Sequence, residues 1–210
     1  MRAIYEKVCY NHVTEWADTK IHREGVRRML TKTETMGYDL AGKEQHRLSA
    51  AMKACASWAA VEEHDKILDM SCGNGALLDH LNGKMRLTLC GMCDTAERAR
   101  AVSEQLGGAD VVPGRMEDIP WRDDTFRVVM LSGAMKGDAR RVLDETLRVL
   151  NNGGQFVMAA PLFSLRGEGD ISRKEMMRLM QEAGFKDVSF RTSGFFGAII
   201  GWKPSLIDAK

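Results

Sequence analysis

Residues 66–81 read KILDMSCGNGALLDHL, a sequence typical of a buried strand, a glycine turn and the start of a helix. Its apolar start suits a short parallel strand that is buried on both faces, and Asp69 follows at the carboxyl end of that strand. Gly73 and Gly75 then allow a tight turn and a close approach of the backbone to a ligand, and residues 76–81 begin a helix with an apolar face. Because open α/β sheets bind ligands just beyond the carboxyl ends of their strands, the stretch predicts a ligand site at this turn.

The spacing of the two glycines argues against one class of cofactor. A dinucleotide site requires the pattern G-x-G-x-x-G, in which the third glycine lets helix and strand pack closely. Counted from Gly73, that third position is Leu78, whose side chain would obstruct the packing. A strand-to-helix turn without any cofactor would also accept glycines, so the turn alone leaves the ligand open.

Four segments of the chain, in order, resemble one enzyme family. The turn matches the pattern L-D-x-G-C-G-x-G, except that Ser71 replaces the first glycine. Further resemblances lie in EDIPWRDDTFRVVML at 117–131, in DARRVLDETLRVLNNGG at 138–154 and in EAGFKDVSF at 182–190. Together these segments resemble the class I methyltransferases that use S-adenosylmethionine, of the small-molecule, methyltransferase domain 11-like type.

The resemblance implies an α/β fold, a Rossmann-like doubly wound sheet of seven strands with an N-terminal helical cap. The cap is expected at residues 1–45, where apolar residues recur at helical spacing, and the cofactor-binding core at 46–210. Within the core, Ser172 is predicted to cap a helix that Gly184 ends, and residues 151–154 are predicted to end the preceding helix. Strands are expected at 66–71, 85–92, 109–112, 125–132, 155–160, 185–192 and 195–202.

The resemblance also implies which residues hold the cofactor, S-adenosyl-L-methionine. Asp69, which only accepts hydrogen bonds when ionised, suits the ammonium group of the cofactor. The glycines bring the backbone close to the ligand, and the end of the strand at 125–132 is expected to border the same site. The expected cofactor-binding residues are Asp69, Ser71, Cys72, Gly73, Asn74, Gly75, Cys93, Asp94, Arg115, Met116, Glu117, Leu131 and Ser132.

Two positions depart from the family pattern. After the second strand the family places an acid that accepts hydrogen bonds from the ribose, and here that position is Cys93, with Asp94 one residue later. Asp94 either binds the ribose or caps the following helix. After the third strand the family often has an acid that reaches the adenine amino group, but Arg115, which has no acceptor, follows Gly114 here. Met116 is expected to pack on the adenine, and Glu117 is a candidate substitute for the acid.

The function that the resemblance implies is methyl transfer to an unidentified small-molecule acceptor. Such a transfer is an in-line displacement, for which a protein mainly supplies alignment and the exclusion of water. No residue is identified as a general base, since Lys136 and the histidines of the expected cap are isolated in the sequence. Because both acids are replaced, the alternative hypothesis is a catalytically weakened methyltransferase-like protein that binds the cofactor or regulates a partner.

Composition bounds the remaining functions. The chain has 210 residues, 44% of them hydrophobic, and a formal net charge of +1, which gives no general attraction to nucleic acid. No apolar run reaches membrane-spanning length, and the first residues lack the apolar core of a signal peptide. We therefore expect no nucleic-acid partner, no membrane association and a cytoplasmic location, while no pattern assigns an oligomeric state.

The five cysteines do not form the pattern of a disulfide framework, because their number is odd and most lie in expected helices or strands. Cys90 and Cys93 form a C-x-x-C pair without a second pair or a nearby histidine, so no metal site is expected. The two side chains are interpreted as small apolar residues of a buried strand.

Overall fold

A computed structural model describes residues 48–82, 86–162 and 171–205. The expected cap at 1–45 and its boundary with the core lie outside these residues. The strands are β1 (Lys66–Asp69), β2 (Thr88–Cys93), β3 (Asp110–Pro113), β4 (Phe126–Ser132), β5 (Leu150–Pro161), β6 (Lys186–Ser193) and β7 (Phe196–Trp202). The helices are α3 (Ala50–Trp58), α4 (Ala76–Asn82), α5 (Ala96–Gln105), α6 (Ala139–Val149) and α7 (Arg173–Ala183).

The seven strands form one sheet in the order β3-β2-β1-β4-β5-β7-β6. The neighbouring strands among β1 to β5 pair in parallel, and β7 pairs antiparallel with both β5 and β6. A hairpin can join only antiparallel strands, so the parallel part needs crossovers. Helices α4, α5 and α6 lie in three of these connections, whereas the connection from β3 to β4 is a loop. The expected doubly wound, seven-stranded α/β sheet is confirmed.

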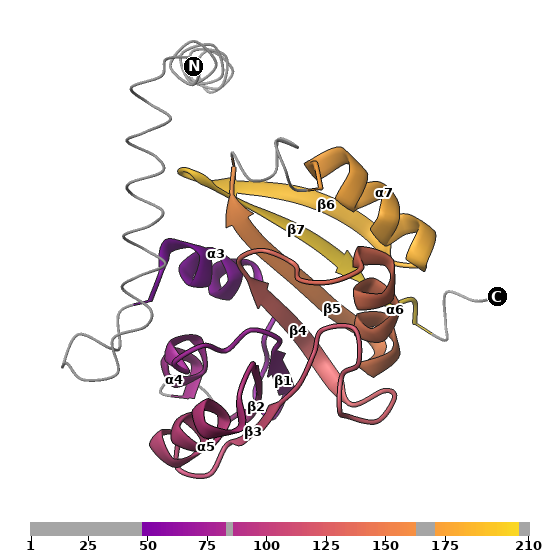
Figure 1. The fold of residues 1–210 in the computed structure, drawn as a ribbon. Coiled ribbons are helices and arrows are strands. Elements are labelled where there is room, and N and C mark those ends of the chain that lie inside the picture. Colours follow the sequence, from indigo (N-terminus) through magenta and orange to yellow (C-terminus); the bar gives the residue numbers. More distant parts are fainter. Residues whose placement is uncertain (1–47, 83–85, 163–170, 206–210) are drawn as a thin grey trace. The chain divides into compact units, whose positions relative to one another are not determined.

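Helices cover both faces of the sheet. Successive side chains of a strand point to opposite faces, so Ile67 packs with residues of α3, α4 and α5, while Leu68 packs with residues of α6 and α7. Figure 1 shows the same division, with α6 and α7 on one side of the sheet and α3, α4 and α5 on the other. Burial on both faces explains why the inner strands read as continuous apolar runs.

The chain reverses its direction across the sheet between β1 and β4. It proceeds from β1 through β2 to β3 at one edge and then returns to β4, which lies on the other side of β1. Ligands of open α/β sheets bind in the crevice that such a reversal leaves at the carboxyl ends of the strands. Asp69 ends β1 and Ser132 ends β4, so two expected site residues flank this point.

The long connection from β3 to β4 is held by one arginine. The guanidinium of Arg148 on α6 donates to the carbonyls of Ile119 at 2.9 Å and Trp121 at 2.8 Å. It also pairs with Glu145 at 2.8 Å, and Glu145 in turn accepts from the Ile119 N–H at 2.8 Å. Two residues of the family-like segment at 138–154 therefore fix the loop that begins with the expected adenine residues.

The predicted helix ends are partly confirmed. The Ser172 side chain accepts from the Glu175 N–H at 3.2 Å, and Gly184 ends α7 with a φ of 113°, which favours glycine. The prediction that residues 151–154 end the preceding helix is wrong. Helix α6 ends at Val149, because Leu150 already has extended backbone and begins β5, which contains residues 151–154.

Candidate active site

The carboxyl group of Asp69 is buried at the end of β1. Its Oδ1 accepts from the Ser71 N–H at 3.1 Å, whereas its Oδ2 has no hydrogen-bond partner among the described residues. Burial raises the pKa of Asp69 to about 7, and the Ser71 N–H, which favours the ionised form, offsets only part of this effect. Buried polar atoms are almost always paired, so an unpaired carboxylate oxygen at a sheet switch point fits a cationic ligand group.

The two glycines of the turn have different structural roles. Gly75 has a φ of +79°, and a Cβ there would lie 2.7 Å from Val102 Cγ1, so Gly75 lets the start of α4 pack against α5. Gly73 has a φ of +53°, and its nearest neighbour would be the Ser71 carbonyl at 4.0 Å. Asn74 caps the turn by accepting from the Ala76 N–H at 3.2 Å. Gly73 alone leaves room for a ligand to reach the backbone.

The end of β2 faces this turn through Cys93. Its Sγ lies 2.8 Å from the Sγ of Cys72 and 3.7 Å from the Gly73 carbonyl oxygen. With Cys72 as donor, the hydrogen bond between the thiols lowers the pKa of Cys93, whereas the same bond and burial raise the pKa of Cys72. The structure thus brings together the expected turn residues and the expected ribose position.

Asp94 lies outside that contact. Its side chain is half-exposed and forms an ion pair with Arg98 on α5. The alternative that Asp94 caps the helix is wrong, because the side chain of Thr95 accepts from the Arg98 N–H at 3.2 Å and Thr95 has the extended backbone of a cap.

Cys90 and Cys93 point to opposite faces of the sheet. Cys90 packs on the face covered by α6 and α7, and Cys93 packs on the face covered by α3 to α5. Odd spacing in a strand requires this, so one ion cannot bind both thiols. The interpretation of the C-x-x-C pair as buried strand residues is confirmed, and within the described ranges no cluster of metal-ligating side chains occurs.

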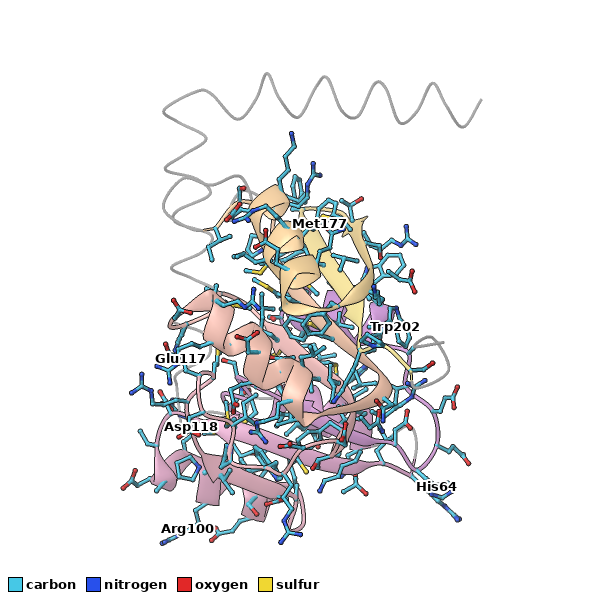
Figure 2. All side chains as sticks on the ribbon, turned by 90° about the vertical axis from the view of Figure 1, so that its right-hand side faces the viewer. His64, Arg100, Glu117, Asp118, Met177 and Trp202 are labelled. Carbon is cyan, nitrogen blue, oxygen red and sulfur yellow. The ribbon has the colours of Figure 1, made fainter. Side chains whose placement is uncertain are left out.

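The expected adenine-binding residues in the loop after β3 contact other residues of the chain. Glu117 pairs with Arg115 at 2.6 Å and accepts from the Asp138 N–H at 2.7 Å, and these two contacts lower the pKa of Glu117. Met116 is buried, and its sulfur accepts from the Lys136 N–H at 3.4 Å. Because Asp138 caps α6, the Glu117 carboxylate ties the loop to the start of this helix, and Figure 2 labels Glu117 in this loop.

The end of β4 contributes a second unpartnered group. Ser132 Oγ is buried and has no hydrogen-bond partner among the described residues. In the parallel pairing Asp69 lies opposite Met130. Ser132 follows Met130 by two residues and ends β4 at the same edge of the sheet. Leu131 is buried in the core, and its carbonyl accepts from the Cys55 thiol at 3.3 Å. Two oxygens without partners therefore lie at the ends of adjacent strands.

Residues 68–158 match the sequence family described as Methyltransferase domain. The matched segment contains all of the expected site residues, together with the turn, the sheet reversal and the unpartnered Asp69 oxygen. This match and the relatives named methyltransferases support a class I methyltransferase that uses S-adenosylmethionine.

Two relatives of this methyltransferase carry methyltransferase names. YrhH of Bacillus subtilis (strain 168) is 29% identical over 136 residues, which are 61% of this chain and 73% of that protein. The 2-methyl-6-phytyl-1,4-hydroquinone methyltransferase 1, chloroplastic, of Oryza sativa subsp. japonica is 26% identical over 144 residues, which are 61% of this chain and 43% of that protein. The match thus spans less than half of the rice enzyme.

A solved structure of geranyl diphosphate methyltransferase in complex with SAM has the same fold as this methyltransferase. The TM-score is 0.61 at 16% sequence identity, and the superposition covers 81% of this chain and 94% of that chain. At this identity the likeness shows the fold alone.

Helix α3 borders the site region and was not among the predicted elements. Cys55 on α3 is buried, and its thiol donates to the carbonyls of Leu131, near the end of β4, and Val157, within β5. Gln155 accepts from the Ala60 N–H at 2.7 Å and so fixes the end of the helix to β5. The available signal was the spacing of Ala51, Ala54 and Cys55, the buried residues of one helix face.

Proposed function

We propose that this methyltransferase transfers the methyl group of S-adenosylmethionine to a small-molecule acceptor through a site centred on Asp69. The observation that carries the proposal is the buried Asp69 Oδ2, which has no partner at the reversal point of the sheet. An ammonium group would provide a charge-assisted hydrogen bond to this oxygen. The amino group of the cofactor's methionyl part is such a group, and its binding would favour the ionised carboxylate.

The neighbouring residues fit the remaining parts of the cofactor. Gly73 leaves open space beside the backbone, Ser132 offers a hydroxyl, and Met116 offers a buried apolar surface for the adenine. When bound, the cofactor supplies a methyl group activated by a sulfonium. The residues of the chain then align the two reactants and exclude water, which is most of what an in-line displacement needs.

The alternative of a weakened enzyme has one observation in its favour. Both acids close to the ribose and adenine positions are engaged, Asp94 with Arg98 and Glu117 with Arg115. If neither acid turns to the cofactor, binding would depend mainly on Asp69 and the turn. A protein of this kind would bind S-adenosylhomocysteine without supporting turnover.

Titration calorimetry on the full chain tests the cofactor. We expect binding of S-adenosylmethionine and S-adenosylhomocysteine and no binding of nicotinamide dinucleotides, because Leu78 occupies the third glycine position of a dinucleotide turn. Binding of a dinucleotide without a response to either sulfur compound would refute the proposal. An Asp69→Asn variant binds at least about tenfold more weakly if the charge-assisted bond is made.

A panel of acceptors tests the reaction. The rice relative is named for a hydroquinone, so substituted hydroquinones and phenols come first, and secondary amines serve as a second chemical class. The readout is the release of S-adenosylhomocysteine, measured with and without acceptor. Binding of the cofactor with no release for any acceptor would favour the weakened-enzyme alternative.

We further propose that nucleic acid is not the acceptor and that the protein acts in the cytoplasm. The net charge of +1 provides no strong electrostatic attraction to phosphates, so any association should be lost at moderate salt. Tight binding of RNA or DNA that persists at high salt would contradict this. In the described ranges no helix combines the length and apolar character needed to cross a membrane.

A further inference from the structure

Two thiols meet where the glycine turn touches the end of β2. The Sγ atoms of Cys72 and Cys93 lie 2.8 Å apart, and both cysteines are free. The Cys72 N–H donates to the Met92 carbonyl at 3.1 Å, so the turn lies directly against the strand at this point. A disulfide requires adjacent backbone segments and a sulfur separation of about 2.0 Å, so roughly 0.8 Å of movement would join the pair.

The two thiols have complementary reactivity. Cys93 keeps 5% of its surface exposed, whereas Cys72 is wholly buried. The hydrogen bond from Cys72 lowers the pKa of Cys93, and the Arg98 guanidinium acts in the same direction. A thiolate with some exposure is the form that oxidants attack, and a neighbouring thiol then resolves the product. By contrast, burial raises the pKa of Cys90 to about 12, on the opposite face of the sheet.

We propose that Cys72 and Cys93 are a modification site, at which a peroxide forms a reversible disulfide that weakens cofactor binding. The effect on binding rests on the proposed function, because Cys72 belongs to the turn and Cys93 to the expected ribose position. The disulfide itself rests only on the geometry of the two thiols.

The chemistry needs hydrogen peroxide as the oxidant. The Cys93 thiolate attacks one peroxide oxygen, a sulfur–oxygen bond forms, the oxygen–oxygen bond breaks, and hydroxide leaves. The Cys72 sulfur then attacks the Cys93 sulfur, the disulfide bond forms, and the sulfur–oxygen bond breaks with loss of water. The net change is two thiols and one peroxide to one disulfide and two waters, so two electrons pass from sulfur to oxygen. A dithiol reductant reverses the step by exchange.

The disulfide would act on the cofactor through the position of the turn. Cys72 lies between Asp69, the expected ammonium ligand, and Gly73, which leaves backbone open to the ligand. A covalent bond would pull this segment toward the end of β2 and hold it there. Binding sites tolerate displacements of only about 0.5 Å, so the bond should disturb both contacts.

Intact-mass and binding measurements on the full chain test the proposal together. Treatment with equimolar hydrogen peroxide should remove about 2 Da from the monomer, and dithiothreitol should restore the mass. Titration with S-adenosylhomocysteine should give an affinity at least about fivefold weaker for the oxidised form than for the reduced form, in the range usual for coupled events. Recovery of the affinity after reduction completes the expected result.

Matched variants locate the bond. Trypsin leaves Cys90 and Cys93 on one peptide, since no lysine or arginine separates them, so Cys90→Ala is the control that must still form the disulfide. Cys93→Ala and Cys93→Ser should both lose it, and their melting curves show whether each variant is folded. A sulfinic acid on Cys93 without a disulfide, or a disulfide that leaves the affinity unchanged, overturns the proposal. Failure of the reduced wild type to bind S-adenosylhomocysteine refutes the proposed function instead, while the mass still decides on the disulfide.

Discussion

The turn at residues 69–75 and the loop at 114–118 both follow a strand of the same sheet, yet their polar groups are used in opposite ways. In the turn, Asp69 Oδ2 is buried without a partner among the described residues. In the loop, Glu117 is engaged twice, with Arg115 and with the Asp138 N–H. An unsatisfied buried group costs free energy that a ligand can recover, whereas an engaged group must first break its own contacts.

This difference divides the candidate site into two ends. The turn is the prepared end, where a polar group lacks a partner, and the loop is the end held by internal contacts. If the proposed function is correct, the turn contacts the methionyl part of the cofactor and the loop contacts the adenine. We therefore expect substitutions in the turn to change cofactor binding strongly and substitutions in the loop to change it little. The following predictions test this division, beginning with the largest effect.

Gly75→Ala should lower the free energy of unfolding by about 2–4 kcal/mol, because the new Cβ would lie 2.7 Å from Val102 Cγ1 at a φ of +79°. Urea denaturation measures the change. Gly73→Ala is the matched control, since it has a strained φ but no close neighbour, and it should cost only about 1–2 kcal/mol. Adding Val102→Ala to the Gly75 variant should recover part of the loss. Equal losses in both alanine variants would show that the packing against α5 is not what requires Gly75.

Asp69→Asn should weaken S-adenosylhomocysteine about 10- to 100-fold at pH 8, as expected for the loss of a hydrogen bond to a charged group. The same variant should raise the melting temperature of the free protein, since a buried carboxylate is removed. Calorimetry and thermal unfolding give the two values. Asp144→Asn on α6, an exposed acid paired with Arg140, should change neither. An unchanged affinity in the Asp69 variant would end the assignment of the ammonium to this residue.

The affinity for S-adenosylhomocysteine should rise about tenfold between pH 6 and pH 8 in the wild type, because the bound form needs an ionised Asp69 and its pKa in the free protein is about 7. The raised pKa of the Asp69 carboxyl also determines how its contribution to the free energy of unfolding changes with pH. The contribution of Asp69 to the stability of the free protein is fully present below about pH 4 and is lost as the pH rises through about 7. Calorimetry at several pH values should show both the affinity slope and its absence in Asp69→Asn. A flat wild-type profile would contradict the role of this carboxyl.

Glu117→Gln should change the affinity for S-adenosylhomocysteine by less than about twofold, because the carboxylate is already engaged with the exposed Arg115 and with the Asp138 N–H. Calorimetry beside the Asp69 variant makes the comparison direct. A loss as large as that of Asp69→Asn would mean that Glu117 leaves its partners and binds the adenine. The loop would then belong to the prepared end of the site.

Sequence patterns within a few residues predicted several helix ends and strands of this protein. The apolar run before Asp69, the cap at Ser172 and the stop at Gly184 depend on neighbours within a few residues, and the structure confirms them. The position of the turn and the sheet type followed from the order of the family-like segments. The wrong end of α6 and the wrong cap of α5 are errors of one or two residues, where several polar residues compete for the same role.

The sequence by itself determined the turn that follows β1, because hydrophobic period and glycine placement are properties of a short stretch of chain, and the family resemblance implied the doubly wound sheet. Only the tertiary structure decided which groups meet. Cys90 is the nearest cysteine to Cys93 in the sequence, but alternation along β2 sends these thiols to opposite faces of the sheet. The thiol that lies 2.8 Å from Cys93 belongs to Cys72, 21 residues earlier, because the parallel pairing of β1 and β2 sets the turn against the end of the second strand.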